Sequence, residues 1–364
     1  MVFYMKFHKM YLEGLWVQNA FGSAHIEGNR LSYQVTENIL NSEDDADTIN
    51  NAIENIYSNI NSNERIKMIN EIIGFRNIEP LFDNCLNKNE DITIELINSF
   101  HSRLMRRVLP DENLGIFRNK NKMITNSHVV LSHYNVIEKD LSEIIEKYQS
   151  MIQNSKNLND KIDALVFLHV GFETVHPFED GNGRVGRMLL TYESIRNGLP
   201  PLIIKENQAQ QYYLGLTMAN ETDEFNSNEI LPRINFDNFN YLKTLFLQNM
   251  QEEFNIITKD EPHFDMLLEK KKEDLTKRMN RISMDPLKSE FVDFYKRRLS
   301  RLDEKYVVFQ DIDSMDPEFD SNSETIMNRL SDFIFTEQEA LALKKEKYLE
   351  HDTLNLNDAS ELEM

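Results

Sequence analysis

Residues with complementary chemistry gather between His176 and Arg187, in the segment HPFEDGNGRVGR. His176 stands before Pro177, which disfavours helical geometry in the preceding residue, so the histidine is expected at a helix end. Residues 181–183, Gly-Asn-Gly, then supply flexible backbone before a helix that restarts near Arg184. Because a helix start offers free N–H groups and the positive end of the helix dipole, an anion site is predicted here.

The charged residues of this segment point to phosphate chemistry. Arg184 and Arg187 are three residues apart and share a face of the first turn, where the helix dipole disfavours cations unless an anion is present. Asp180 offers the hard oxygen that Mg²⁺ prefers beside phosphates. The neutral imidazole of His176 can take a proton from an attacking hydroxyl near pH 7. The combination predicts attack on a nucleotide phosphate, catalysed by positioning and charge neutralisation.

A dinucleotide-binding interpretation competes for the same glycines. Gly181, Gly183 and Gly186 satisfy GxGxxG, and Glu206 follows twenty residues after the last glycine. That pattern requires a preceding strand, whereas these glycines follow ETVHPFED, which is charged and broken by proline. No GxxxxGK[ST] phosphate loop occurs in the sequence. Dinucleotide binding is therefore the weaker interpretation.

The segment resembles the signature of the Fic family, HxFx[DE]GNGRxxR, and the resemblance covers roughly residues 22–245. All defined positions match: His176, Phe178, Asp180, Gly181, Asn182, Gly183, Arg184 and Arg187. The resemblance implies that His176 is the general base, that Phe178 anchors the loop and that Asp180 is a ligand of Mg²⁺. It also implies that Asn182 and the N–H groups of Gly181 and Gly183 form the anion hole. Arg184 and Arg187 would contact the outer phosphates. The stretch QAQQYYLGL resembles the family's helix near the nucleobase, with Tyr213 as a nucleotide contact. Core packing of Tyr212 and Tyr213 is an alternative that the sequence supports at least as well.

By this resemblance the chain is expected to be a protein adenylyltransferase. It would transfer AMP from ATP, its co-substrate, to a Ser, Thr or Tyr hydroxyl of a protein target, with Mg²⁺ bound. Three alternatives stay open: removal of AMP from a modified protein, another donor such as UTP or CDP-choline, and a catalytically silent protein-binding module. Homodimerisation rests on family analogy alone.

A second motif, GSAHIEGNRLS, lies far upstream. Ser23 and Glu27 share a face if the segment is helical, and Gly28 is a natural helix stop. The motif resembles the [ST]xxxE[GN] inhibitory helix of class II Fic proteins. That resemblance implies that Glu27 pairs with Arg187 and prevents it from holding the γ-phosphate, so the enzyme is expected to be autoinhibited.

The composition limits which partners, disulfides and cellular location are expected. The net charge of −21, from 40 Lys and Arg against 61 Asp and Glu, argues against nucleic acid and anionic membranes as partners. The one cysteine, Cys85, excludes an intrachain disulfide and is expected to be a buried thiol. The start of the chain carries Lys6, Lys9 and Glu13 within apolar stretches and lacks a signal-peptide pattern. We expect a cytoplasmic protein.

The predicted fold class is all-α: a Fic-type helical bundle with a small β-hairpin flap and an acidic, helical C-terminal extension. Helical apolar stripes run through residues 92–104 and 165–175, and KMITNSHVVL at 122–131 is typical of a hairpin. The predicted domains are an N-terminal helical region at 1–110 with the inhibitory helix at 22–28, a catalytic core at 111–250, and an extension at 262–364 whose last residues are frayed. The segment DIDSMD lacks the glycine and final acid of a calcium loop. Packing or surface roles are expected for the histidines outside the motif: His101, His128, His133 and His169.

Overall fold

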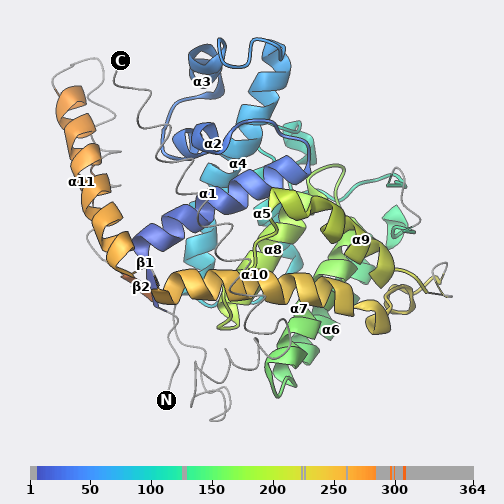
Figure 1. Cartoon of the computed structure of the whole chain (residues 1–364). Coiled ribbons are helices and arrows are strands. Elements are labelled where there is room, and N and C mark those ends of the chain that lie inside the picture. Colours follow the sequence, from blue (N-terminus) through green and yellow to red (C-terminus); the bar gives the residue numbers. More distant parts are fainter. Residues whose placement is uncertain are drawn as a thin grey trace. The chain divides into compact units, whose positions relative to one another are not determined.

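The computed structural model describes residues 6–124, 129–222, 224, 227–259, 261–283, 296, 299 and 306–308. These residues are mainly helical, as predicted (Figure 1). Their α-helices are α1 (Lys9–Ile26), α2 (Tyr33–Leu40), α3 (Ala46–Ile53), α4 (Ser62–Asn87), α5 (Ile94–Leu104), α6 (Ile137–Gln153), α7 (Leu158–Val175), α8 (Asn182–Arg196), α9 (Ala209–Ala219), α10 (Asn240–Lys259) and α11 (Glu261–Ser283).

Several helices begin where the sequence offers a capping side chain. Asp45, Asn61, Thr93 and Asn157 precede α3, α4, α5 and α7, and each accepts a hydrogen bond from the backbone N–H three residues later. Such caps satisfy N–H groups that have no partner within the helix. The residues next to each helix start are therefore sufficient to define where these four helices begin.

Helix α7 is central to the core. It packs against α6, α8 and α10, and its residues are buried along nearly the whole length. The predicted stripe Leu165, Leu168, Phe172 and Val175 is buried. Helix α1 packs against α4 and α8, which brings residues near the start of the chain to the helix that contains the second half of the HPFEDGNGRVGR segment (Figure 1).

The described strands lie outside the predicted hairpin. Strand β1 (Lys6–His8) pairs antiparallel with β2 (Tyr306–Val308), with Phe7 opposite Val307. Tyr306, Val307 and Val308 are residue types that favour strands. Residues 122–124 and 129–131 contain no strand, and residues 125–128 lie outside the described residues. The hairpin at 122–131 therefore stays a prediction.

The C-terminal predictions are covered only in part. The charge-rich segment at 270–281 is helical, within α11, and α11 packs against α1 with Lys271 paired to Glu13. The chain divides into a unit at Met1–Met315 and a second at Asp316–Met364, and the second lies outside the described residues. The division at Pro262, the calcium-like segment and the frayed end stay predictions. Cys85 is buried, as expected.

Candidate active site

The end of α7 holds His176 in an unusual backbone conformation. Its φ of 49° and ψ of 61° are left-handed, and its N–H donates to Phe172 O at 2.9 Å. Few residues other than glycine adopt this region, so the surrounding contacts must hold it. Burial, and then the positive charge of Arg118, lower the pKa of His176 to about 4. The imidazole is neutral at pH 7 and can accept a proton.

The loop after His176 is closed around Phe178. This side chain is fully buried, as its predicted anchoring role requires. Both polar atoms of the Asn182 side chain bond its backbone: Phe178 N–H donates to Oδ1 at 2.8 Å, and Nδ2 donates to Phe178 O at 2.9 Å. Asn182 can therefore offer a phosphate only its backbone N–H. The predicted anion-hole role is restricted to that group.

His101 supports the same loop from α5. Its ring stacks on Phe178 at 3.8 Å between centroids. Nε2 lies 3.0 Å from Asp180 O, and Gly115 N–H donates to Nδ1 at 2.9 Å. Burial lowers the pKa of His101 to about 4. A neutral ring that donates through Nε2 and accepts through Nδ1 satisfies both contacts, so His101 packs as expected and also fixes the loop.

Helix α8 begins with open N–H groups. Gly181 precedes it with φ 86° and ψ 3°, a left-handed conformation that glycine adopts at little cost, and no side chain caps the helix. Val185 N–H donates to Gly181 O, so the N–H groups of residues 182–184 come before the first bond within the helix. These groups form the geometry predicted for an anion site.

Asp180 and Arg184 flank this helix start. Arg184 is buried, and its Nη2 lies 3.1 Å from Asp180 Oδ1, while Nη1 lies 3.3 Å from Glu71 Oε1 on α4. Gly181 N–H also donates to Asp180 Oδ1, at 2.6 Å. Both contacts of this carboxylate fall on Oδ1, so Oδ2 of the half-exposed Asp180 is the oxygen that remains for a cation.

Arg187 makes the predicted contact with Glu27. Its Nη2 lies 2.7 Å from Glu27 Oε1, and Ser23 accepts two further bonds, from Nε to its Oγ and from Nη2 to its backbone oxygen, both at 3.0 Å. The Arg187 side chain is 2% exposed and that of Glu27 is 30% exposed. Burial is the largest influence and lowers the pKa of Arg187, but Glu27, Tyr212 and Glu173 together outweigh burial and raise the pKa above its usual value. The guanidinium is thus held charged against α1.

Two glycines permit this contact. Helix α1 ends at Ile26, one residue before Glu27, and Gly28 turns the chain with φ 92°, as its position predicted. At Gly183 an added Cβ would lie 2.3 Å from Glu27 Oε1 and 2.9 Å from Arg187 Nη1. A side chain at residue 183 would displace the ion pair.

The two tyrosines of α9 have different environments. Tyr212 is buried, and its Oη lies 2.7 Å from Nε2 of His169, which is also buried. Tyr213 is 46% exposed, and its Oη donates to Ile26 O at 3.3 Å. Packing is therefore observed for Tyr212, while Tyr213 lies at the end of α1 beside the ion pair, where a nucleotide contact stays a prediction.

A buried acid, Glu173, was missed by sequence reasoning. It lies on α7, with Oε2 3.9 Å from His176 Nδ1, and its Oε1 is buried without a hydrogen-bond partner. Burial raises its pKa to about 8, Arg187 opposes this shift, and Glu27 reinforces it. Glu173 is thus protonated at neutral pH. Its spacing of three before His176 on a helix was the available signal.

Contacts between the motif and residues 118–132 were also missed. Lys122 Nζ lies 3.0 Å from Glu179 Oε1 and also donates to Glu179 O. Glu179 occupies an unconstrained signature position, so nothing in the sequence marked it. The ion pair places the start of the predicted flap beside the motif.

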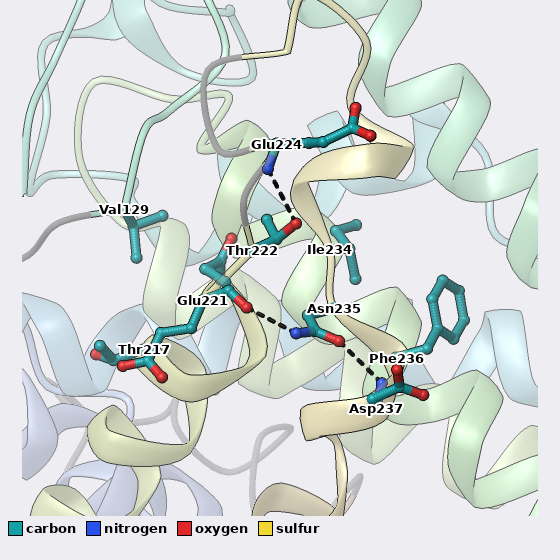
Figure 2. A pocket seen from close by; sticks show the side chains of 10 residues that line it. Val129, Thr217, Glu221, Thr222, Glu224, Ile234, Asn235, Phe236 and Asp237 are labelled. Carbon is teal, nitrogen blue, oxygen red and sulfur yellow. Dashed lines mark hydrogen bonds between the residues drawn. The ribbon is translucent and has the colours of Figure 1, made fainter.

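A cavity of about 1130 Å³ lies apart from the predicted site residues (Figure 2). Val129 lines it together with Thr217, residues 220–222, Glu224 and residues 234–237, and Asn235 Nδ2 donates to Glu221 O at 2.7 Å. Its lining includes Glu221, Glu224 and Asp237 and no Lys or Arg. Such a lining repels phosphate, and the cavity contains none of the predicted site residues, so it is not the nucleotide site.

Metal and membrane features were searched among the described residues. Within them, no cluster of three or more His, Cys, Asp or Glu side chains has the arrangement of a metal site. No described helix combines the length and the apolar character that crossing a bilayer requires.

Known proteins match the chain in this region. Residues 91–193 match the Fic/DOC family. The protein named Protein adenylyltransferase Fic from Aedes aegypti is 31% identical over 211 residues, and that from Drosophila melanogaster is 29% identical over 210 residues. Each match covers 57% of this chain and 38% of the relative, so this chain spans about two fifths of their length.

A solved structure supports the fold. A Fic domain-containing signaling protein from Bacteroides thetaiotaomicron superposes with a TM-score of 0.52 at 16% identity, covering 68% of this chain and 89% of that one. The matched residues 91–193 include the complete loop from His176 to Arg187, whereas Ser23 and Glu27 lie upstream of them. Residues 91–193 of the chain thus match the Fic/DOC family, and the matched residues include the turn that joins α7 to α8.

Proposed function

We propose that this chain is a protein adenylyltransferase that transfers AMP from ATP to a hydroxyl of a protein target. The observation that carries the proposal is the meeting, at the start of α8, of a neutral histidine, open N–H groups, a half-exposed carboxylate and two buried arginines. The similarity to proteins named as Fic adenylyltransferases supports the same activity.

The residues divide the reaction between them. The N–H groups of residues 182–184, with Arg184 and Arg187, bind and orient the phosphates through the helix start and its dipole. His176 takes the proton of the target hydroxyl as that oxygen forms a bond to the α-phosphorus. The bond to the bridging oxygen then breaks, and pyrophosphate leaves. Positioning and charge neutralisation supply most of the rate.

Mg²⁺ fits Asp180. This ion is usually held by one or two carboxylates together with phosphates and water, so a single protein ligand with a free Oδ2 meets the requirement. When bound, Mg²⁺ would neutralise charge on the phosphates. The chain's own contribution is to keep Asp180 oriented, through Gly181 N–H and Arg184.

Glu27 keeps the proposed enzyme inactive. An outer phosphate that approaches Arg187 must replace a carboxylate at 2.7 Å, and Ser23 holds the same guanidinium by two bonds. ATP then binds in a pose unsuited to attack. Displacement of the end of α1 would release Arg187 and start transfer.

Labelled ATP tests the activity. The parent, Glu27→Ala and the double variant Glu27→Ala/His176→Ala are incubated with cell extract, Mg²⁺ and ATP labelled at the α-phosphate. Label should appear on protein weakly with the parent, strongly with Glu27→Ala, and not with the double variant. Equal labelling by all three, or none by any, would contradict the proposal.

The same carboxylate supports a second candidate, removal of AMP from a modified protein. Glu27 is partly exposed beside the predicted phosphate site, where it could orient a water molecule. Modified protein made by Glu27→Ala is purified and incubated with the parent or with Glu27→Gln. Release of AMP by the parent alone would support removal, and no release by either would exclude it.

A further inference from the structure

Arg118 binds two segments of the chain at once. It is 4% exposed, and its guanidinium donates only to backbone oxygens. Nε reaches His176 O at 2.8 Å, and Nη1 reaches Lys120 O at 2.7 Å. Nη2 reaches Val175 O at 3.3 Å and also Ser132 O. Four carbonyls thus share one cation.

The charge of Arg118 is compensated by a helix end. Among the described residues, no carboxylate forms an ion pair with it, unlike the neighbouring Arg233, which lies 3.3 Å from Asp140 Oδ2. Val175 and His176 supply carbonyls from the C-terminal end of α7, where the helix dipole is negative and a cation is favoured. The helix end, together with the more distant attraction of Glu179, explains how an arginine can be buried here without a directly paired acid.

The bonded groups lie on both sides of the segment predicted as the flap. Lys120 precedes residues 122–131 and Ser132 follows them. The position of Ser132 is fixed further, because its N–H donates to Thr174 O at 3.2 Å and Arg233 Nη2 donates to its Oγ at 2.8 Å. Arg118 N–H also donates to Pro177 O at 2.9 Å. One residue therefore connects both ends of this segment to the loop that carries His176.

We propose that Arg118 is a positioning residue that holds His176 together with Lys120 and Ser132, the residues on either side of the predicted flap at 122–131, so that a target hydroxyl meets the imidazole. This inference rests on the proposed adenylyl transfer. Arg118 touches neither nucleotide nor hydroxyl in this scheme. It acts through the backbone of His176 and of the two residues, Lys120 and Ser132, that flank the predicted flap.

A positioning role differs measurably from a purely structural one. Loss of the four bonds should lower the rate of transfer to protein and leave ATP affinity unchanged, because the start of α8 is not bonded to Arg118. The positive charge of Arg118 has a separate effect, which is on the pKa of His176. The charged groups facing His176 are Arg118, Lys122 and Glu27, and Glu173 faces it as a titratable acid that is protonated at neutral pH. Removing the cation of Arg118 removes the second cause of the lowered His176 pKa, so the acid limb of the pH profile should move to higher pH.

Two substitutions separate bonding from charge, both made in the Glu27→Ala background. Arg118→Lys keeps the charge but cannot reach four carbonyls, and Arg118→Gln loses both. Arg103→Gln, an exposed arginine on α5, is the matched control. Transfer of α-phosphate label to protein, ATP affinity and folded fraction by circular dichroism are measured from pH 4 to 8.

We expect both Arg118 variants to lose about 10- to 100-fold in rate per folded molecule, with ATP affinity within about twofold of the background. The acid limb should stay in place in Arg118→Lys and shift upward in Arg118→Gln. Unchanged rates, or rates and ATP affinity that fall only in proportion to the folded fraction, would overturn the inference. If Glu27→Ala with intact Arg118 transfers no label, the proposed function itself fails.

Discussion

Removing Glu27 should activate the enzyme by an amount that the structure sets. In Glu27→Ala, the bond of 2.7 Å to Arg187 Nη2 disappears, while the two bonds from Arg187 to Ser23 remain. A hydrogen bond to a charged group contributes about 1.5–3 kcal/mol. We take about 2 kcal/mol, because Arg187 is 2% exposed but Glu27 is 30% exposed and partly screened by water. This free energy corresponds to about a 30-fold change in the population with Arg187 released.

The rate of transfer from α-labelled ATP should therefore rise about 30-fold in Glu27→Ala. AMP lacks the outer phosphates that Arg187 would hold, so its affinity should change less than about twofold. Glu138→Gln, an exposed acid on α6, serves as control and should match the parent. Rates within twofold of each other in Glu27→Ala and parent, with ATP bound by both, would refute the reasoning about the ion pair.

Further expectations concern the base, the metal, the buried acid and the loop anchor. In the Glu27→Ala background, the rate of transfer should be constant from pH 6 to 8. It should fall only at lower pH, where His176, with its pKa lowered to about 4, takes up a proton. A midpoint near 6.5 in the pH profile would contradict the argument that burial lowers this pKa. EDTA should abolish transfer without changing the melting temperature, since Mg²⁺ is proposed to be held by the phosphates and by the single carboxylate of Asp180. A lower melting temperature with EDTA would reveal a structural metal. Glu173 has a folded pKa raised to about 8, above its unfolded value near 4.5, so the folded state binds more protons and loses stability as pH rises from about 4.5 to 8. Glu173→Gln should remove this loss, so the difference between the melting temperatures of the variant and the parent should shift in favour of the variant as pH rises across that range. A difference that stays constant with pH would show that Glu173 does not titrate there. Phe178→Ala should lower the free energy of unfolding, measured with urea, by about 3–5 kcal/mol, because this side chain is fully buried. A decrease of less than about 1 kcal/mol would mean that other residues anchor the loop.

The sequence predicted those features that depend on local chemistry. Pro177 and Gly181 mark the end of α7 and the start of α8 because one restricts the preceding residue and the other permits a left-handed turn. The contact between Arg187 and Glu27 was expected from a family resemblance. Spacing alone placed Ser23 and Glu27 on one face of a helix, without a partner.

Other features depend on packing that no local pattern encodes. Arg118 and His101 reach the signature loop across 58 and 79 positions of the sequence, and each bonds backbone oxygens, which are the same for every residue type. The strand pairing of Lys6–His8 with Tyr306–Val308 joins residues that are still farther apart in the sequence. Asn182 matched the signature, yet its side chain closes the loop rather than facing a ligand.

The central claim is that AMP, and not the γ-phosphate, passes to protein. The most direct measurement incubates Glu27→Ala and a protein target found in the extract with ATP labelled at the α-phosphate or at the γ-phosphate, and follows the target by intact mass. The account predicts α-label and a mass increase of one AMP on a hydroxyl residue, both lost with His176→Ala. Label from the γ-phosphate, or α-label that persists without His176, would contradict it.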